Sequence, residues 1–313
     1  MRKGDKGAQF DFVWLFAIIA GGVILVLAIY GALQAGSSQR FITDTEVAKT
    51  ISILTNPMQA SFSEGSFGQI LFKQETRINN ICLDGGFGEN KISVSTKSNV
   101  GEPWGIPGVE TKVVNKYIFS TEKDSGEIYH VFSKPFYFPY KVADLTFITT
   151  ENYCFINAPD KIADEVSNIK NINATGCNFE NALRVCFGSG STCDINVYGT
   201  CTGFCDTIFD EGTVSKKGSE MKYVGNLMYG AIFSDKTVYN CNVNRLMYRT
   251  GKIAEGLTSK SDLMNARNCN TNLKGEVASW SDRTINSTFE NLLTLNYGNL
   301  DKRNDGEICG LWS

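Results

Sequence analysis

The sequence has little of three things that would point to a class of function. It contains one histidine and six prolines, it has no cluster of Lys and Arg, and its formal net charge is -3 with a pI near 5.4. A nucleic-acid partner is excluded, because neutralising phosphates requires clustered basic residues. With few prolines, no low-complexity tract and no repeat of fixed period, a collagenous stalk, a mucin-like stem and a solenoid are also excluded.

Patterns typical of catalysis and of metal binding are also scarce. His130 is the only candidate base for a His-based triad, and it lies in an alternating stretch with no motif around it. The chain has no nucleophile elbow, no phosphate loop and no paired-histidine metal motif. Residues 301–306 match a calcium loop poorly, because Arg303 stands where a ligand is needed. We therefore predict no catalytic residue, no cofactor and no metal site.

The longest feature of the chain is the uncharged apolar run at residues 12–33. As an α-helix this run would be roughly 33 Å long, enough to cross the ~30 Å hydrocarbon core of a bilayer. A cleaved signal peptide has an apolar stretch of only about 7 to 15 residues, so the run is too long for one. We predict a transmembrane helix over residues 12–33, with the lipid bilayer as its partner.

The residues on either side of the run predict its orientation. Arg2, Lys3 and Lys6 precede it, which gives a small positive-inside bias. All ten cysteines follow it, and an even number of cysteines in an exported chain suggests disulfides. We predict a single-pass protein of the cell membrane with a cytoplasmic N-terminus, its C-terminal domain outside, and disulfides among Cys82, Cys154, Cys177, Cys186, Cys193, Cys201, Cys205, Cys241, Cys269 and Cys309.

Two short patterns add candidate sites to this topology. Asn173 and Asn286 each begin an acceptor triplet for N-glycosylation, which is compatible with an extracellular location. Inside the apolar run, small residues on one helical face would allow close packing with a second copy or with another membrane subunit; these are Ala17, Gly21, Ala28 and Ala32. Since Gly and Ala are frequent in all transmembrane helices, the pattern is equally compatible with no partner.

The N-terminal tail, residues 1–11, ends in Lys6-Gly7-Ala8-Gln9-Phe10-Asp11 directly before the apolar run. This stretch resembles the leader of archaeal type IV pilins, in which a peptidase cuts after a glycine that follows a basic residue. The resemblance implies cleavage after Gly7, a mature N-terminus at Ala8 and a filament built around the apolar helix. Asp11 is the fourth residue after the cut, whereas the family usually has a Glu at the fifth. The other interpretation is an uncleaved signal anchor.

The rest of the chain predicts an α+β fold. A capping box at Thr43 and Glu46, followed by apolar residues at helical spacing, predicts a stalk helix within residues 34–60. β-Branched and aromatic residues between Gly-rich turns predict a β-rich domain over residues 61–170, which ends in a helix at 159–170. We expect the apolar stripe of the stalk helix to pack on this domain.

Residues 135–140 contain four aromatic side chains and two prolines. Exposed aromatic clusters often mark a surface that binds a glycan or a protein partner. Aromatic rings also commonly close one edge of a hydrophobic core. The sequence leaves both interpretations open.

Four cysteines lie close together between Cys186 and Cys205. The alternating residues around them predict a β-hairpin in which Val185 pairs with Ile195, and this register places Cys186 and Cys193 on opposite faces. A direct bridge between them would need a bulge. We expect the four cysteines to bridge among themselves, because zinc sites usually contain two closely spaced pairs that this spacing lacks.

Residues 171–313 are predicted to form a cysteine-rich α+β region with C-terminal helices. The continuous apolar run 227–233 predicts a buried strand, and helical spacing predicts one helix over 244–264 and another through Ile285, Phe289, Leu292 and Leu293. The stretches 229–234 and 242–247 resemble an uncharacterised group of archaeal membrane-anchored surface proteins. That resemblance implies a source and a location but no activity.

Taken together, these patterns predict a membrane-anchored protein of the cell surface or envelope with a structural or partner-binding role and no enzymatic activity. The alternative is a type IV pilin-like filament subunit, a large minor pilin, that is processed after Gly7. The two hypotheses predict different mature N-termini.

Overall fold

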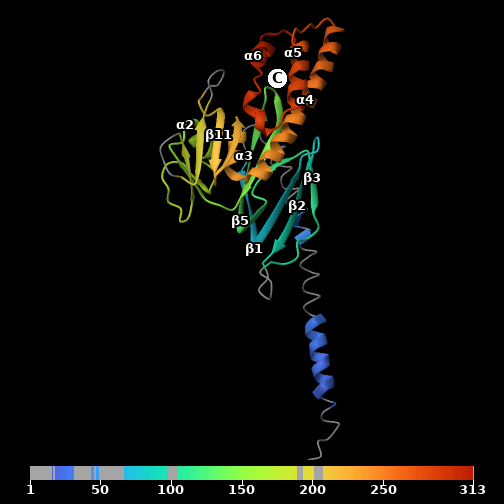
Figure 1. Ribbon diagram of the computed structural model, residues 1–313, viewed down its shortest axis with the longest axis vertical. Helices are drawn as coiled ribbons and strands as arrows, with labels where there is room; N and C mark the ends of the chain where they lie inside the picture. The colour runs from blue at the N-terminus through green and yellow to red at the C-terminus, as the bar shows by residue number, and fades with distance from the viewer. Residues whose placement is uncertain are drawn as a thin grey trace, which may run out of the picture.

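We describe the protein from a computed structural model. The structure describes residue 16 and residues 18–31, 44–45, 47–48, 67–97, 104–188, 193–200 and 207–312. Within these residues the fold is mixed α+β, with two six-stranded sheets, several helices and four disulfides (Figure 1). The α+β prediction is confirmed at this level. We call residues 67–312 the head.

The first sheet has the strand order β3-β2-β1-β5-β6-β4. Its strands are β1 (Phe67–Leu83), β2 (Glu89–Thr96), β3 (Thr111–Val114), β4 (Tyr117–Phe119), β5 (Lys123–Tyr137) and β6 (Lys141–Thr149). The sequence predicts a hairpin here, with strands at 71–82 and 91–96 on either side of the turn 84–88, and it is confirmed: β1 and β2 pair antiparallel, with Leu83 opposite Glu89. Gly88 closes the turn at a φ of +56°, and a Cβ there would lie 2.1 Å from the Leu83 carbonyl oxygen, so the turn requires glycine.

The second sheet has the strand order β12-β11-β10-β9-β7-β8. Its strands are β7 (Tyr153–Ile156), β8 (Ile172–Asn173), β9 (Leu183–Phe187), β10 (Ile195–Gly199), β11 (Glu211–Lys216) and β12 (Ser219–Val224). Val185 pairs with Ile195 as predicted, but β9 and β10 run parallel, so the predicted hairpin is wrong. The physical reason is that alternation of apolar residues identifies the buried face and reads the same in either strand direction.

The helical elements are α2 (Asp160–Val166), α3 (Leu227–Phe233), α4 (Lys236–Asn265), α5 (Lys274–Ile285), the 3-10 helix η1 (Phe289–Thr294) and α6 (Leu300–Gly306). The predictions of α2 and of a helix over 244–264 are confirmed, although α4 begins earlier. The predicted helix through Ile285 and Leu293 is wrong, because Thr288 caps a separate 3-10 turn. Residues 301–306 lie in α6 and do not form a calcium loop.

The predicted strand at 227–233 is also wrong, because these residues form α3. Every residue of α3 is buried. A helix that is surrounded by protein is apolar on all sides, so its sequence shows the same unbroken run as a buried strand. Gly230 allows close contact with the first sheet, since a Cβ at this position would lie 2.7 Å from the Phe119 ring.

The main hydrophobic core lies around α3 and takes residues from both sheets and from the C-terminal helices. Aromatic rings dominate its centre. The Phe233 ring on α3 lies 5.2 Å from Phe132 on β5 and 4.7 Å from Tyr153 on β7, measured between ring centroids. Edge-to-face contacts of this kind add about 0.5 to 1.5 kcal/mol per pair beyond the burial of apolar area. The aromatic contacts of α3 therefore hold the two sheets together.

A second, smaller core covers the opposite face of the first sheet, and the described part of the stalk helix packs on it. Residues 44–45 and 47–48 are helical, and Ala48 is fully buried against this core. The Asp44 carboxylate accepts a bond from the Thr96 backbone N–H (3.3 Å), and the Thr45 hydroxyl accepts one from the Val109 N–H (2.9 Å). The predicted packing of the stalk on the next domain is thus confirmed for these residues, whereas Ile51 and Leu54 lie outside the described residues.

α4 is joined to the first sheet by a buried arginine. Arg245 is 0% exposed, and its guanidinium donates to the carbonyls of Phe87 and Lys116 (both 2.9 Å) and to the side-chain oxygens of Asn90 (2.5 Å) and Asn242 (2.8 Å). All four acceptors are neutral. Burial lowers the pKa of the guanidinium, because its charge is taken out of water. The network replaces water with fixed protein dipoles around this charge.

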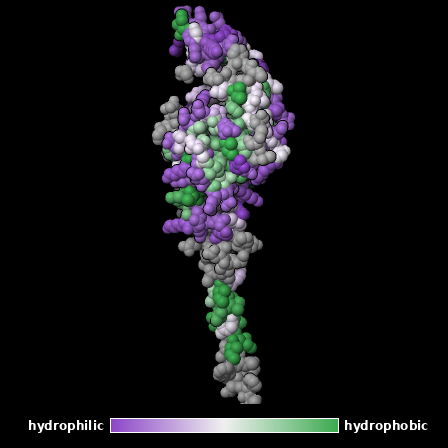
Figure 2. Space-filling model, turned by 90° about the vertical axis from the view of Figure 1, so that its left-hand side faces the viewer, coloured by the Kyte–Doolittle hydropathy of each residue, from purple (hydrophilic) through white to green (hydrophobic). Residues whose placement is uncertain are grey.

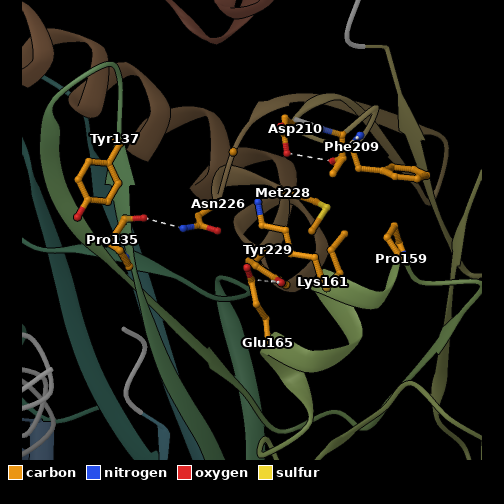
Figure 3. A pocket seen from close by; sticks show the side chains of 13 residues that line it. Pro135, Tyr137, Pro159, Lys161, Glu165, Phe209, Asp210, Asn226, Met228 and Tyr229 are labelled. Carbon is orange, nitrogen blue, oxygen red and sulfur yellow. Dashed lines mark hydrogen bonds between the residues drawn. The ribbon is translucent and has the colours of Figure 1, made fainter. Parts of the chain in front are cut away.

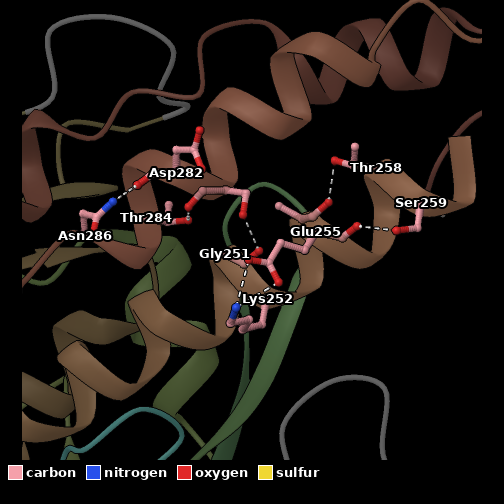
Figure 4. Close-up of polar contacts among 10 residues, drawn as sticks. Gly251, Lys252, Glu255, Thr258, Ser259, Asp282, Thr284 and Asn286 are labelled. Carbon is pink, nitrogen blue, oxygen red and sulfur yellow. Dashed lines mark hydrogen bonds and ion pairs between the residues drawn. The ribbon is translucent and has the colours of Figure 1, made fainter. Parts of the chain in front are cut away.

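α4 and α5 pack closely because small residues lie between them (Figure 4). The Ser281 hydroxyl donates to the Gly251 carbonyl (2.8 Å). A Cβ at position 251 would lie 2.3 Å from Ile285 and 2.9 Å from the Ser281 carbonyl oxygen. Any larger residue at Gly251 would therefore push α5 away from α4. Polar residues cover the outside of this pair, including the ion pair between Lys252 and Glu255 (2.9 Å).

Lys216 on β11 is a buried cation at the end of α3. Its ammonium donates to the carbonyls of Ile232 (2.8 Å) and Ser234 (3.2 Å), where the helix dipole favours positive charge. Burial nevertheless dominates and lowers the pKa of Lys216 from 10.5 to about 8.

We expect the stability of the protein to rise with pH between about 8 and 10.5 because of Lys216. In this window the unfolded chain keeps the proton and the folded chain has lost it, so the unfolded state binds more protons. Relative to Lys216→Met, the gain across the window should be roughly 3 kcal/mol. Urea denaturation at several pH values measures it. The exposed Lys236→Met is the control, and a wild-type difference from Lys216→Met that does not change with pH would contradict the prediction.

Candidate binding cavity

The predicted disulfides are confirmed wherever the structure describes both cysteines. The pairs are Cys82–Cys241, Cys154–Cys177, Cys186–Cys193 and Cys269–Cys309. Among the described cysteines none is free. Cys201 and Cys205 lie outside the described residues. The Cys82–Cys241 bridge joins β1 to α4. The Cys269–Cys309 bridge joins the α4–α5 connection to the C-terminal end of the head.

The bridge between Cys186 and Cys193 forms directly, without the bulge that a hairpin would have needed. β10 begins at Ile195, so Cys193 lies in the connection before the strand. Its side chain is therefore free of the strand alternation that would place it opposite Cys186. Two of the four closely spaced cysteines thus bridge within the group, as predicted, and they are not available as zinc ligands.

The candidate residues of the N-terminal segment are described only in part. Phe16 and residues 18–31 are helical, and their apolar side chains are mostly exposed, so the helix is largely hydrophobic over its visible surface (Figure 2). Across the described part of the chain, no helix reaches the length and apolarity of a membrane span. Gly21 has open space around it. The other packing and processing candidates, apart from the exposed Ala28, lie outside the described residues; these are Ala17, Ala32, Gly7, Ala8 and Asp11.

The two glycosylation candidates differ in accessibility. Asn286 is exposed at the end of α5, where its side-chain amide donates to the Asp282 carbonyl (2.8 Å; Figure 4). Asn173 is half-buried at the end of β8, and its side-chain oxygen accepts bonds from the backbone N–H groups of Thr175 (3.0 Å) and Gly176 (3.1 Å). Of the two, Asn286 is the more accessible acceptor.

His130 lies within β5, and its surroundings are those of a structural residue. Its Nδ1 is 3.3 Å from the side-chain amide nitrogen of Gln69 on the neighbouring strand. Burial lowers the pKa of the imidazole, and the charge of Lys170 lowers it further. An amide partner does not activate a nucleophile, so this contact stabilises strand pairing.

The four aromatic residues at 135–140 do not all have the same role. Three of them belong to the core, and one is exposed. Phe136, Phe138 and Tyr140 are buried in the main core, and the Trp280 indole N–H donates to the Phe138 carbonyl (3.3 Å). These three rings close the core and form no platform. Tyr137 points away from the core and is 54% exposed.

Tyr137 lines the cavity of about 230 Å³ that Figure 3 shows. Four segments far apart in the sequence form its wall: the end of β5, the first turns of α2, the residues before β11 and the start of α3. They contribute Pro135, Tyr137, Pro159, Lys161, Ile162, Glu165, Thr207, Phe209, Asp210, Gly225, Asn226, Met228 and Tyr229. The cavity therefore exists only in the folded protein.

Glu165 is the carboxylate whose position in the cavity is best defined. Its Oε2 accepts bonds from the Tyr229 hydroxyl (2.8 Å; Figure 3) and from the Lys134 ammonium (3.1 Å). Burial raises the pKa of Tyr229 well above its usual value, and the Glu165 charge adds to this, so the phenol stays protonated and donates. Both bonds end on Oε2, which leaves Oε1 as a fixed acceptor.

The other polar groups of the cavity are oriented in the same way. The Asn226 amide nitrogen donates to the Pro135 carbonyl (2.7 Å), so its oxygen has a defined direction. The Asp210 carboxylate accepts from the backbone N–H and the hydroxyl of Thr207 (both 3.0 Å). Lys161 is exposed at the edge and supplies a donor.

Comparison with known proteins adds nothing to this description. No family model, no curated protein and no solved structure matches the chain. The chemistry of the cavity therefore rests on its own residues. Its lining contains no Ser, Cys or His, and within the described residues no group of His, Cys, Asp and Glu side chains has metal-binding geometry. The arrangement of fixed acceptors, one donor and aromatic walls is suited to binding a polar ligand.

Only one feature of the sequence indicates this site, namely the aromatic cluster that contains Tyr137. Glu165 and Lys161 belong to the predicted helix at 159–170, and Asn226 and Asp210 carry no pattern at all. Their proximity depends on tertiary contacts such as the Tyr229–Glu165 bond between α3 and α2, which local spacing does not encode.

Proposed function

We propose that this protein is a membrane-anchored protein of the cell surface or envelope, and that its disulfide-braced head is a non-catalytic binding or structural module. The observation that carries the proposal is that every described cysteine is paired. The cytosol keeps thiols reduced, whereas exported domains keep such bridges. An apolar run precedes all of these cysteines, and its exposed side chains at residues 18–31 require lipid or protein around them.

A binding role for the head is supported by the cavity. Glu165 and Asn226 are each held by hydrogen bonds to neighbouring residues, so a ligand would meet acceptors that are already oriented. Its described lining contains no Ser, Cys or His, so it offers no Ser–His or Cys–His pair for nucleophilic catalysis. The partners are the lipid bilayer, the ligand of this cavity, and a second copy or another subunit through the apolar helix.

The alternative function, a type IV pilin-like filament subunit, is favoured by one observation. Residues 44–45 and 47–48 are helical and contact the head, where Ala48 is buried on the first sheet. A filament subunit needs its apolar helix fixed to the head in this manner, because the helix forms the core and the head the surface.

Mass spectrometry of the protein from its native membranes tests both functions. For an anchored surface protein we expect an intact N-terminus, release of the head by a protease added to whole cells, and almost no reactive thiols after unfolding without reductant. Loss of residues 1–7, together with filaments that vanish in Asp11→Ala, would replace this proposal by the pilin. A head protected from the protease and rich in free thiols would contradict both.

A further inference from the structure

We propose that the cavity between α2, α3 and the end of β5 binds one ring of a neutral saccharide, either a hexopyranose or an N-acetylhexosamine. This inference rests on the proposed binding role of the head and names the chemical class of its ligand. The juxtaposition that carries it is an acceptor pair fixed by hydrogen bonds, Glu165 and Asn226, in a cavity whose lining also includes Tyr137 (Figure 3).

The size of the cavity suits a single sugar ring. Its volume is about 230 Å³. Pockets for drug-sized ligands and cofactors typically occupy about 300 to 1,000 Å³, so a nucleotide or a lipid chain would not be enclosed. A terminal ring of a longer glycan could enter while the rest of the glycan stays in solvent.

The walls of the cavity match the apolar faces of a pyranose ring. Tyr137, Phe209 and Pro135 are among the apolar and aromatic residues that line the cavity. Phe209 is held in place by an edge-to-face contact with Phe187, at a centroid distance of 5.6 Å. The C–H groups of a sugar face pack on such surfaces, and aromatic side chains offer large contact area with little loss of conformational entropy.

The polar groups match the hydroxyls of a sugar. A hydroxyl has one donor and two acceptor positions. Glu165 Oε1 and the Asn226 side-chain oxygen would accept from hydroxyls, and the Lys161 ammonium would donate to one. Because Tyr229, Lys134 and the Pro135 carbonyl already hold the two acceptors, binding would order few protein side chains.

Other ligand classes fit these residues less well. An anion such as phosphate would lie near the carboxylates of Glu165 and Asp210, and Lys134 is already paired with Glu165. A purely apolar ligand would cover the same carboxylates without giving them hydrogen-bond donors, which is costly. A neutral polyhydroxyl ligand satisfies the acceptors without adding charge.

The test is ligand-observed NMR on the full chain in a detergent that contains no sugar, with four separate probes: D-glucose, D-galactose, D-mannose and N-acetyl-D-glucosamine. We expect saturation transfer to at least one of them, with a millimolar dissociation constant. Glu165→Gln and Tyr137→Ala should each weaken that binding about tenfold, since each removes one contact to the ring. Glu220→Gln, an exposed carboxylate on β12, should leave it unchanged.

Two variants keep the test decisive if one of them disturbs the fold. Tyr137 is exposed and lies outside the core, so its removal should leave the circular dichroism spectrum and the melting temperature unchanged even if Glu165→Gln loosens α2. No binding of any of the four sugars, or binding that is unaffected by Tyr137→Ala, would overturn the proposal. Neither result bears on the membrane location, which the protease and thiol measurements test separately.

Discussion

Replacement of Arg245 by methionine should lower the free energy of unfolding by about 3 to 5 kcal/mol, because it leaves several buried acceptors without donors. The carbonyls of Phe87 and Lys116 and the side-chain oxygen of Asn90 would all lose their bond to the guanidinium. Methionine fills much of the volume but donates nothing. The variant no longer has to bury the charge of Arg245, but this gain offsets only part of the lost stability, because each unsatisfied acceptor costs about 1 to 3 kcal/mol.

Arg249→Met, one turn further along α4, is the matched control. Arg249 is only partly buried, and its Nε donates to one carbonyl, that of Val142 (2.8 Å). We expect this variant to lose about 1 kcal/mol. Chemical denaturation of both variants measures the difference. If Arg245→Met were no less stable than Arg249→Met, the buried network would not hold α4 to the first sheet.

Removal of the Cys82–Cys241 bridge by the double substitution Cys82→Ala and Cys241→Ala should cost about 5 kcal/mol. This bridge closes a loop with a sequence separation of 159, so its loss frees a large part of the unfolded ensemble. In the chain-entropy model the cost grows with the logarithm of loop length. We expect a marked drop in melting temperature under non-reducing conditions.

The Cys186–Cys193 bridge, with a separation of 7, is the internal comparison. Its removal in the same manner should cost only about 2 kcal/mol, because the loop is short. Equal losses for the two double variants would show that native contacts, and not loop entropy, set the effect. Cys82 Sγ lies 3.9 Å from the Arg245 guanidinium, so the effects of the Cys82 and Arg245 substitutions should not be additive.

The parts of the fold that the sequence predicted well are those with a strong local pattern. The β1–β2 hairpin has alternating residues on both sides of a Gly-rich turn, and α4 has apolar residues at helical spacing over several turns. Both signals are local, so tertiary packing did not override them. The pairing of Val185 with Ile195 was predicted for the same reason, because matching buried faces fixes the register.

The parts that were missed depend on packing at long range. α3 is helical because it is enclosed by two sheets and by α4, and nothing within Leu227–Phe233 distinguishes that environment from the middle of a sheet. The direction of β10 relative to β9 depends on the chain that connects them. The alternation of apolar residues within the two strands does not encode that connection. Likewise, Glu165, Asp210 and Asn226 line one cavity only because three segments far apart in the sequence come together in the fold, so these three residues had no signature in the chain.

The bridge from β1 to α4 also determines how the head would respond to mechanical tension. Tension applied between the N-terminal segment and the C-terminal end of the head would reach Cys82 along β1. From there it would pass through the Cys82–Cys241 sulfurs to α4, bypassing the polypeptide between the two cysteines. That polypeptide would not be stretched, so the extension at rupture would be shorter by about 500 Å than for the unbridged chain. The bridge would thus shield the elements from β2 to the start of α4, including the whole second sheet, whereas β1 up to Cys82 would itself carry the tension.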